Sequence, residues 1–472
     1  MVSLVIHEKY SNEDLGVEII PVFTGEKTDL TLREKEYDLE KTTLYKARAK
    51  GEKDVLFVGL GKKTEISPYK LRCAGGAAGR FIRKCKYNSA HLSSSFRSGA
   101  GEFAEGFLMG AYKFHRYKSA GKEPDADIVL HAAETSVSGA EAEKIRAMAN
   151  GASFARDLSN MSTNELYPLA FAEIISKRFA NSDVKVRVYN ADELEKEGFV
   201  GTAAVGRGSG HEPCYLELAY KTADEAEPLL ALAGKGITFD MGGMNIKLDD
   251  DLSGSRADMS GAAAVVGAVD IIRGLGVKAN IAALIPLAEN LPSSRAFLPG
   301  TVIAYPQGPT VEISNTDCEG RVILADALLH AERLGAEYVI DIATLTGNIG
   351  SALGGRLAGI WGDKGLCDAL VNIGDELGDR LWEMPLVTEY NKYIRSCYAD
   401  IRNSPTNGDA GAIAAALFLK HFIKDGIVWA HIDMASTDIT KSPYGYLPKG
   451  ASGFGARLLA EYVCSKKPLY NE

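Results

Sequence analysis

Residues 229–247 read LLALAGKGITFDMGGMNIK. The apolar run Leu229–Ala233 has the composition of a strand that is buried in a parallel sheet. After it come three charged residues, Lys235, Asp240 and Lys247, separated by glycine, apolar and small polar residues. Because ligands of open α/β sheets bind beyond the carboxyl ends of the strands, this stretch predicts both such a sheet and a ligand site at its edge.

Outward from this stretch, apolar strand-like runs alternate with helical ones. Further strands are predicted at Val184–Tyr189, Ala279–Pro286, Tyr338–Ala343 and Val428–Asp433. Helices are predicted at Leu169–Phe179, Gly261–Arg273, Leu324–Leu334 and Ala412–Ile423. Such alternation is typical of α/β layers, in which a central and largely parallel sheet is flanked by helices.

The N-terminal third shows the same alternation on a smaller scale. Strands are predicted at Val17–Phe23, Asp54–Gly59 and Asp127–His131, and helices at Tyr69–Lys86 and Glu102–Tyr112. A long helical pattern from Ser138 to Leu158 ends in the polar turn cluster Ser159–Asn164. We therefore expect two domains, a smaller N-terminal α/β domain over residues 1–137 and a larger C-terminal α/β domain over 160–472, joined by a helix over 138–159.

The composition is that of an ordinary globular protein, with 46% hydrophobic and 24% charged residues. The net charge of −9 argues against nucleic-acid binding by the whole chain, because phosphate recognition needs clustered Lys and Arg. No apolar run reaches the roughly 18 residues that cross a bilayer, and Met1–Glu8 lacks the features of a signal peptide. The seven cysteines are dispersed and never spaced C-x-x-C, as in reduced cytosolic proteins. We expect a cytoplasmic protein with no membrane partner.

Another carboxylate, Asp258, lies just before the helix predicted at Gly261–Arg273 and is flanked mostly by small residues. A buried carboxylate is costly unless it is paired or bound to a metal, so Asp258 is a candidate ligand. Two structural alternatives stay open. Asp258 is also a preferred type of helix cap, and Lys235 and Lys247 could be solvated loop lysines.

A second charged stretch, residues 314–321, reads SNTDCEGR. If it is extended, Asp317, Glu319 and Arg321 point to one face, because strand side chains alternate with period two. The alternative is a charge ladder on the surface. The following run Val322–Leu329 is almost wholly apolar, which places the three charges next to a buried helix and favours a buried site.

The two stretches and Asp258 together supply four carboxylates, and neither stretch contains a histidine. Four negative charges would balance two divalent cations, and an oxygen-rich set without Cys or His argues against a single His-rich zinc site. A pair of divalent ions bridged by carboxylates, as used for hydrolysis, fits better. Lys235 could join as a neutral amine only if a metal displaced its proton. The candidate carboxylates are Asp240, Asp258, Asp317 and Glu319.

Several of these strings resemble the leucyl aminopeptidase (cytosol aminopeptidase) family of two-metal exopeptidases. The resemblance runs from about Ala155 to the C-terminus, whereas the N-terminal domain matches only by its position and α/β pattern. The string Asn-Thr-Asp-x-Glu-Gly-Arg is highly specific. The matching segments are Gly234–Asp240, Asp258–Met259, Asn315–Arg321, Asp341–Gly347 and Trp429–Asp433.

The resemblance implies roles for these residues in cleaving the N-terminal peptide bond. Lys247 would polarise the scissile carbonyl and stabilise its oxyanion, and Arg321 would bind a bicarbonate that takes a proton from a metal-bridging water. Zinc or manganese are the expected ions. The tighter ion would be held by Lys235, Asp240, Asp258 and Glu319. The exchangeable ion would be held by Asp240, Asp317 and Glu319.

Short peptides with a free N-terminus are the substrates that the resemblance implies, and Thr344, Leu345 and Gly347 match positions that line the family's substrate cleft. The family is typically hexameric, with active sites facing an interior cavity, so a homohexamer is expected. At two pocket positions where relatives often carry methionine, this chain has Leu252 and Ser255. Losing a methionine for a serine removes apolar contact, so we expect a preference broader or more polar than leucine.

Two other functions fit parts of the sequence. The carboxylates alone would also suit a two-metal hydrolase of another ester class, such as phosphoesters. A basic stretch within the predicted helix Tyr69–Lys86 is either a solvated helix face or a nucleic-acid-binding surface added by the N-terminal domain. It comprises Arg72, Arg80, Arg83, Lys84 and Lys86.

Overall fold

The computed structural model of the chain describes residues 2–8, 16–25, 44–48, 54–119, 127–248 and 251–465. They form two compact units. Unit 1 comprises Met1–Ser153 with the short segments Glu376–Gly378 and Thr440–Ser452, and unit 2 comprises the rest. Helix α3 (Gly139–Asn160) runs across the division between them. Within the described residues, no helix combines the length and apolar character needed to cross a bilayer.

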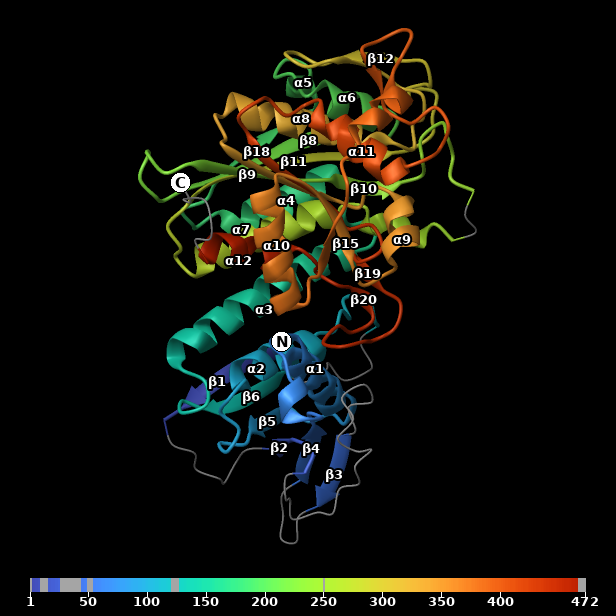
Figure 1. Cartoon of the computed structure of the whole chain (residues 1–472). Helices are drawn as coiled ribbons and strands as arrows, with labels where there is room; N and C mark the ends of the chain where they lie inside the picture. Colours follow the sequence, from blue (N-terminus) through green and yellow to red (C-terminus); the bar gives the residue numbers. More distant parts are fainter. Residues whose placement is uncertain are drawn as a thin grey trace. The chain divides into compact units, whose positions relative to one another are not determined.

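Unit 1 is built on a six-stranded sheet in the order β1-β6-β5-β2-β4-β3 (Figure 1). All neighbouring strands are parallel except β3, which runs antiparallel to β4. The strands are β1 (Val2–His7), β2 (Val17–Val22), β3 (Leu44–Arg48), β4 (Asp54–Gly59), β5 (Ser89–Leu92) and β6 (Ile128–Ala133). Helices α1 (Pro68–Lys84) and α2 (Ala100–Ala111) pack closely, because a Cβ on Gly75 would lie 1.9 Å from the Phe103 carbonyl oxygen.

Three arginines of the basic stretch at α1 have partners within unit 1. Arg72 is buried and pairs with Glu105 at 2.7 Å. Arg80 donates to the Gly445 carbonyl at 2.7 Å, and Arg83 donates to the Ala111 carbonyl. These three guanidinium groups have partners within unit 1, whereas Lys84 and Lys86 are exposed, as expected for a solvated face.

Unit 2 contains a nine-stranded sheet whose path is β16-β15-β18-β14-β9-β11-β8-β7, with β10 added beside β11. The centre, β18-β14-β9-β11, is parallel, whereas β8 and β7 continue antiparallel, as does the β15-β18 pair. This confirms the predicted α/β fold with a largely parallel sheet. The strands are β7 (Lys185–Tyr189), β8 (Cys214–Lys221), β9 (Leu229–Gly234), β10 (Gly236–Asp240), β11 (Asn280–Asn290), β14 (Tyr338–Ala343), β15 (Ala358–Gly362), β16 (Leu381–Glu383) and β18 (Val428–Asp433).

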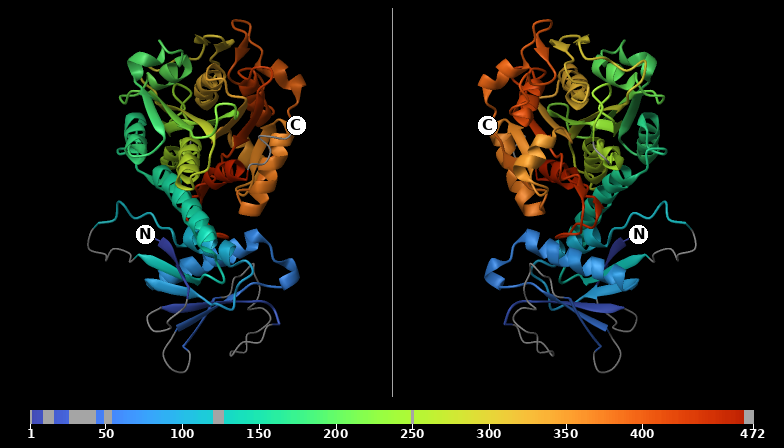
Figure 2. Two further views of the ribbon diagram at one scale, coloured as in Figure 1. Left: turned by 90° about the vertical axis from the view of Figure 1, so that its left-hand side faces the viewer. Right: turned by 90° about the vertical axis from the view of Figure 1, so that its right-hand side faces the viewer.

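Helices cover both faces of this sheet (Figure 1), and Figure 2 shows the layers from two further sides. One face packs against α8 (Glu319–Arg333), α11 (Gly411–Lys420) and α6 (Val200–Gly206). The other carries α7 (Ser260–Gly274), α12 (Ala456–Cys464) and α4 (Pro168–Phe179). The remaining elements are α5 (Ala191–Leu194), α9 (Gly347–Leu353), α10 (Lys364–Leu377), η2 (Lys63–Glu65), η3 (Ser253–Ala257), η4 (Thr388–Ile394), β12 (Val302–Ala304), β13 (Thr310–Glu312), β17 (Ile401–Arg402), β19 (Ile439–Thr440) and β20 (Gly450–Ala451).

Glycines let α7 approach the sheet closely. A Cβ on Gly261, in the first turn of α7, would lie 2.2 Å from the Ile342 carbonyl oxygen, and a Cβ on Gly234 would lie 2.7 Å from the Ala262 Cα atom. Real Cβ atoms do not tolerate such distances, so only glycine fits at either position. The close approach brings the start of α7 against the end of β9, where Lys235 and Asp258 lie.

One buried carboxylate joins two helices on the opposite face. Asp326 of α8 is fully buried and accepts hydrogen bonds from the backbone N–H groups of Gly201 (3.1 Å) and Thr202 (2.6 Å) and from the Thr202 hydroxyl (2.6 Å). These groups lie in the first turn of α6, where N–H groups have no partner within the helix. Burial raises the pKa of Asp326 to about 7, although its hydrogen bonds oppose the rise.

We expect Asp326→Asn to change how stability depends on pH. An unfolded aspartate has a pKa of about 3.9. Because the folded value is higher, the unfolded chain loses this proton first, and the wild-type side chain destabilises the fold increasingly as pH rises from about 4 to about 7. The neutral variant lacks this term, so its stability relative to wild type should rise across that window. Chemical denaturation at several pH values measures the difference, and a difference independent of pH would contradict the assignment.

Candidate metal centre

Lys235 lies between β9 and β10 and is fixed by its backbone on two sides. Its N–H donates to the Ile342 carbonyl at 3.1 Å, and its carbonyl accepts from the Ala262 N–H at 2.9 Å. The residue is 3% exposed. A solvated loop lysine is therefore the wrong interpretation of Lys235, whose side chain is directed into the protein.

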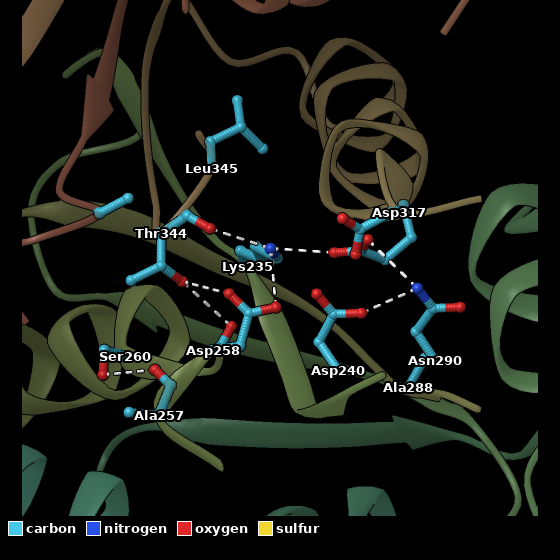
Figure 3. Close-up of polar contacts among 12 residues, drawn as sticks. Lys235, Asp240, Ala257, Asp258, Ser260, Ala288, Asn290, Asp317, Thr344 and Leu345 are labelled. Atoms are coloured by element: carbon cyan, nitrogen blue, oxygen red, sulfur yellow. Dashed lines mark hydrogen bonds and ion pairs between the residues drawn. The ribbon is translucent and has the colours of Figure 1, made fainter. Parts of the chain in front are cut away.

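The Lys235 ammonium joins three chain segments (Figure 3). Its Nζ lies 2.8 Å from Asp258 Oδ2 and 3.0 Å from Glu319 Oε1, and it donates to the Thr344 carbonyl at 2.9 Å. Asp258 does not cap α7, since Met259 occupies the N-cap position. The Asp258 carboxylate instead accepts from the Thr344 hydroxyl at 2.7 Å. The capping interpretation of Asp258 is thus also wrong.

The stretch 314–321 is not extended, so the condition for a shared strand face of its charges is not met. Helix α8 begins at Glu319, five residues before the predicted start at Leu324, so Glu319 and Arg321 lie in its first turn. An acidic residue is favourable there because the helix dipole is positive at its N-terminus. Glu319 and Asp317 therefore converge through a turn that enters a helix rather than through strand alternation.

Lys247 is the second ammonium group of the site. Its Nζ lies 2.8 Å from Asp240 Oδ2 and also pairs with Asp317 Oδ1. Carboxylate oxygens of Asp240, Asp317 and Glu319 lie within 4.8 Å of one another. The structure thus brings all five predicted ligands and Lys247 into one cluster.

The charges of this cluster do not balance. Burial, reinforced by the Glu319 charge, raises the pKa of Asp240 to about 6, and burial also raises the pKa of Asp258 well above its ordinary value. Burial by itself would lower the pKa of Lys235, but Asp258 and Glu319 raise it above the usual range. Four carboxylates thus face only two ammonium groups. Such a surplus is costly in a buried site and suits divalent cations, which favour oxygen ligands.

Sequence reasoning missed Asn290, which braces two of the carboxylates. Its Nδ2 donates to Asp240 Oδ1 (2.9 Å), to the Thr316 carbonyl (3.0 Å) and to Glu319 Oε2 (3.2 Å) (Figure 3). Asn290 ends β11 directly opposite Asp240 of β10. Nothing in the sequence identifies this partner, because the predicted strand stopped at Pro286 and the pairing of β10 with β11 is a feature of the tertiary fold.

A second missed residue, Asn403, is fully buried and shapes the loop before α8. Its Oδ1 accepts from the Ser314 N–H at 2.9 Å, and its Nδ2 donates to the Asn315 carbonyl at 2.7 Å. Its own carbonyl accepts from Arg321 Nη1 at 2.8 Å. Arg321 is 4% exposed, and its Nε has no hydrogen-bond partner among the residues that the structure describes. One buried donor of this guanidinium is therefore unsatisfied among the described residues.

The predicted substrate residues lie on two segments beside the cluster. Thr344 and Leu345 follow β14, and Gly347 begins α9. The Leu345 N–H donates to Asp433 Oδ1 at 3.0 Å. Leu252 and Ser255 are half-buried on the segment that leads through η3 to Asp258. Thr344 binds the Asp258 carboxylate with its hydroxyl, whereas Ser255 reaches Asp258 only through the backbone, since its carbonyl accepts from the Asp258 N–H at 3.3 Å.

Comparison with known proteins matches the sequence of the chain to one family. Residues 153–460 match the model of the cytosol aminopeptidase family catalytic domain, and residues 38–121 match the model of its N-terminal domain. The chain belongs to the cytosol aminopeptidase family. The sequence resemblance is thereby confirmed, and it extends into the N-terminal region, where the sequence had offered only position and pattern.

Relatives and solved structures agree with this membership. The chain is 38% identical to a probable cytosol aminopeptidase of Geobacter sp. (strain M21), over 87% of this chain and 86% of the relative, and 38% identical to one of Roseiflexus castenholzii, over 89% and 88%. The structure of the bottromycin maturation enzyme BotP in complex with Mn superposes with a TM-score of 0.88 at 32% identity, covering 96% of this chain and 99% of BotP. The cytosol aminopeptidase of Coxiella burnetii gives 0.84 at 27% identity, covering 98% and 99%.

Family membership fixes the general activity. This family member is a peptidase, and its activity is that of a metallo-aminopeptidase that uses a divalent cation and acts on peptides. The predicted enzyme class is confirmed, and the acidic cluster is chemically suited to such a cation.

Gly320 provides a test of the Lys235 geometry. A Cβ at this position would lie 2.5 Å from Lys235 Cε and 2.7 Å from Nζ, so Gly320→Ala should displace the lysine from Asp258 and Glu319. We expect Mn²⁺ binding, measured by isothermal titration calorimetry, to weaken about tenfold or more, as for other changes that misorient ligands.

The matched control is Gly274→Ala. Gly274 ends α7, and a Cβ there meets nothing within 4 Å. Its Mn²⁺ affinity should equal that of the wild type. Equal affinity in Gly320→Ala as well would show that the position of Lys235 is irrelevant to metal binding.

Proposed function

We propose that the chain removes N-terminal residues from short peptides with two divalent ions held at this centre. The observation that carries the proposal is the cluster of Asp240, Asp317 and Glu319 oxygens within 4.8 Å, flanked by Lys235 and Asp258. One ion would be held by Lys235, Asp240, Asp258 and Glu319. The other would be held by Asp240, Asp317 and Glu319.

Such a pair of ions would supply the Lewis acidity that activates water and a position for the free α-amine of the substrate. The chain's own groups keep the ligands in position. Asn290 holds one oxygen each of Asp240 and Glu319, and the Thr344 hydroxyl holds Asp258. Zinc or manganese would fit this oxygen-rich set, and the similarity to the Mn-bound BotP structure favours manganese.

Lys247 would bind the oxygen of the scissile carbonyl. Its side chain is 23% exposed, so it can reach both the buried carboxylates and an incoming substrate. Burial by itself would lower its pKa, but Asp240 raises the pKa above the ordinary value, so the side chain stays positively charged. A fixed positive charge beside the carbonyl stabilises the oxyanion that develops during attack.

Arg321 would hold a bicarbonate ion that acts as the general base. The unpartnered Nε of this buried guanidinium supports the idea, because a buried donor left without an acceptor is costly. The Asn403 carbonyl fixes the other side of the guanidinium. A bicarbonate bound here would accept the proton of the attacking water.

The substrate side of the proposal rests on Thr344, Leu345 and Gly347 beside the cluster, and on Leu252 and Ser255. With Leu252 and Ser255 in place of methionines, the enzyme should accept a broader or more polar range of first residues than leucine. We further propose that the enzyme is a cytoplasmic homohexamer that admits only short peptides. A monomer mass measured by light scattering would contradict the hexamer.

Metal removal and substrate blocking test the aminopeptidase reaction together. The manganese-loaded protein should hydrolyse a panel of aminoacyl amides. Activity should be lost when a chelator removes the metal and should return when manganese is restored. The N-acetylated amides should resist, because their amine cannot bind the ion. Hydrolysis of acetylated substrates, or of phosphoesters in preference to amides, would contradict the proposal, and a sharp optimum for leucine would contradict the broad preference.

Two variants test the catalytic assignments. Lys247→Met should lower kcat about 10²- to 10³-fold, as loss of an oxyanion donor does, while metal content stays constant. Wild-type rates should rise with added bicarbonate, and Arg321→Ala should be slow and insensitive to it. A variant that still responds to bicarbonate would show that the anion acts elsewhere.

A further inference from the structure

A row of buried polar side chains crosses the sheet of unit 2 beneath its helices. His431 of β18 lies opposite Asp341 of β14 and opposite Trp361 of β15 in the strand register. All three are fully buried. His431 Nδ1 lies 2.5 Å from Asp341 Oδ1, and Trp429 Nε1 donates to Asp341 Oδ2 at 2.8 Å.

Burying these polar side chains costs folding free energy, and none of them is a proposed metal ligand. A buried carboxylate with its imidazole partner often contributes less to stability than apolar residues of the same size would. The Nε2 of His431 has no hydrogen-bond partner among the described residues, so Asp341 is the group that orients the ring. The strand that carries His431 continues to Asp433, which binds the loop beside the metal centre.

Asp433 lies between His431 and the loop 344–347, which follows β14. It lies two residues after His431, on the same face of β18, and is 1% exposed. Its Oδ1 accepts from the N–H groups of Leu345 (3.0 Å) and Thr346 (3.4 Å), and its Oδ2 accepts from the Thr346 hydroxyl (2.7 Å). Burial raises the pKa of Asp433, and the charge of His431 opposes the rise.

The loop that Asp433 holds continues directly into the metal centre. Thr344 precedes the two clamped N–H groups, and its carbonyl accepts from Lys235 while its hydroxyl binds Asp258. A shift of Leu345 and Thr346 would therefore move the groups that hold Lys235 and Asp258. Hydrogen bonds thus run from Asp433 through this loop to the proposed ligands, and His431 lies beside Asp433 on the same face of β18.

We propose that His431, oriented by Asp341, is a positioning residue that keeps Asp433 clamped on the loop 344–347 and thereby sets Lys235 and Asp258 for metal and substrate. The catalytic part of this inference rests on the proposed function. The ordering of the loop does not, because it is a property of the folded chain.

Two substitutions at His431 separate a positioning role from a general structural one. His431→Leu fills a similar volume without a polar group. His431→Asn keeps an N–H near the position of Nδ1, so it can still donate to Asp341 and should rescue. His330→Leu is the matched control, because His330 is also a buried histidine beside a carboxylate, Glu217 Oε2 at 3.5 Å from its Nε2, but lies toward the end of α8 away from the loop.

Hydrogen exchange of the metal-free protein gives the direct readout. In His431→Leu, the amides of Leu345 and Thr346 should exchange about tenfold faster or more than in wild type, whereas His431→Asn and His330→Leu should leave them unchanged. The manganese affinity of His431→Leu should fall about tenfold or more, with a higher KM for aminoacyl amides. If His431→Leu does not fold, Asp341→Asn takes its place, because it removes the charge while keeping the shape.

Unchanged exchange and affinity in His431→Leu would overturn the inference, as would equal losses in His330→Leu. Failure of the proposed function is distinguishable. A wild-type protein that hydrolyses no aminoacyl amide would refute the proposed reaction, and the exchange rates would still decide whether His431 holds the loop.

Discussion

The ion pairs of the buried Lys235 ammonium are the interaction on which the rest of the site depends. They join the end of β9, the segment before α7 and the first turn of α8, and a hydrogen bond adds the loop after β14. An ammonium so enclosed is stable only because carboxylates surround it. The same carboxylates exceed it in charge, so the cluster that secures the lysine also attracts cations.

Glycines, which lack a side chain, matter to the site as much as the charged residues do. Gly261 lets α7 reach the sheet at Ile342, and Gly320 leaves the volume that the Lys235 side chain fills. Gly261 and Gly320 thus mark close approaches of backbone and side chain around the centre. This explains how four acidic side chains from separate elements come within reach of two lysines.

Much of this could be predicted from the sequence. The apolar strand Leu229–Ala233 and its charged continuation gave the sheet and the site, because burial of charged groups is costly and therefore informative. The start of α8 could not be predicted, since Asp317, Glu319 and Arg321 suit a strand face and a helix N-terminus equally well in isolation. Asn290 could not be predicted either, because its role follows from the register of β10 on β11.

Charged residues were also hard to interpret where their partners are backbone groups. Arg80 and Arg83 gave a basic stretch in the sequence, but their partners are carbonyl oxygens, which every residue carries. Asp326 was similarly hidden in an apolar run, because its donors are the N–H groups of a helix start far away in the chain.

Helix α8 carries an acidic residue of the centre at its beginning and, two turns further on, the carboxylate that receives α6. The first carboxylate is the first residue of the helix, and the second is near its middle. The helix that presents Glu319 to the centre therefore also fixes where α6 docks, so the acidic cluster and this part of the core share one support.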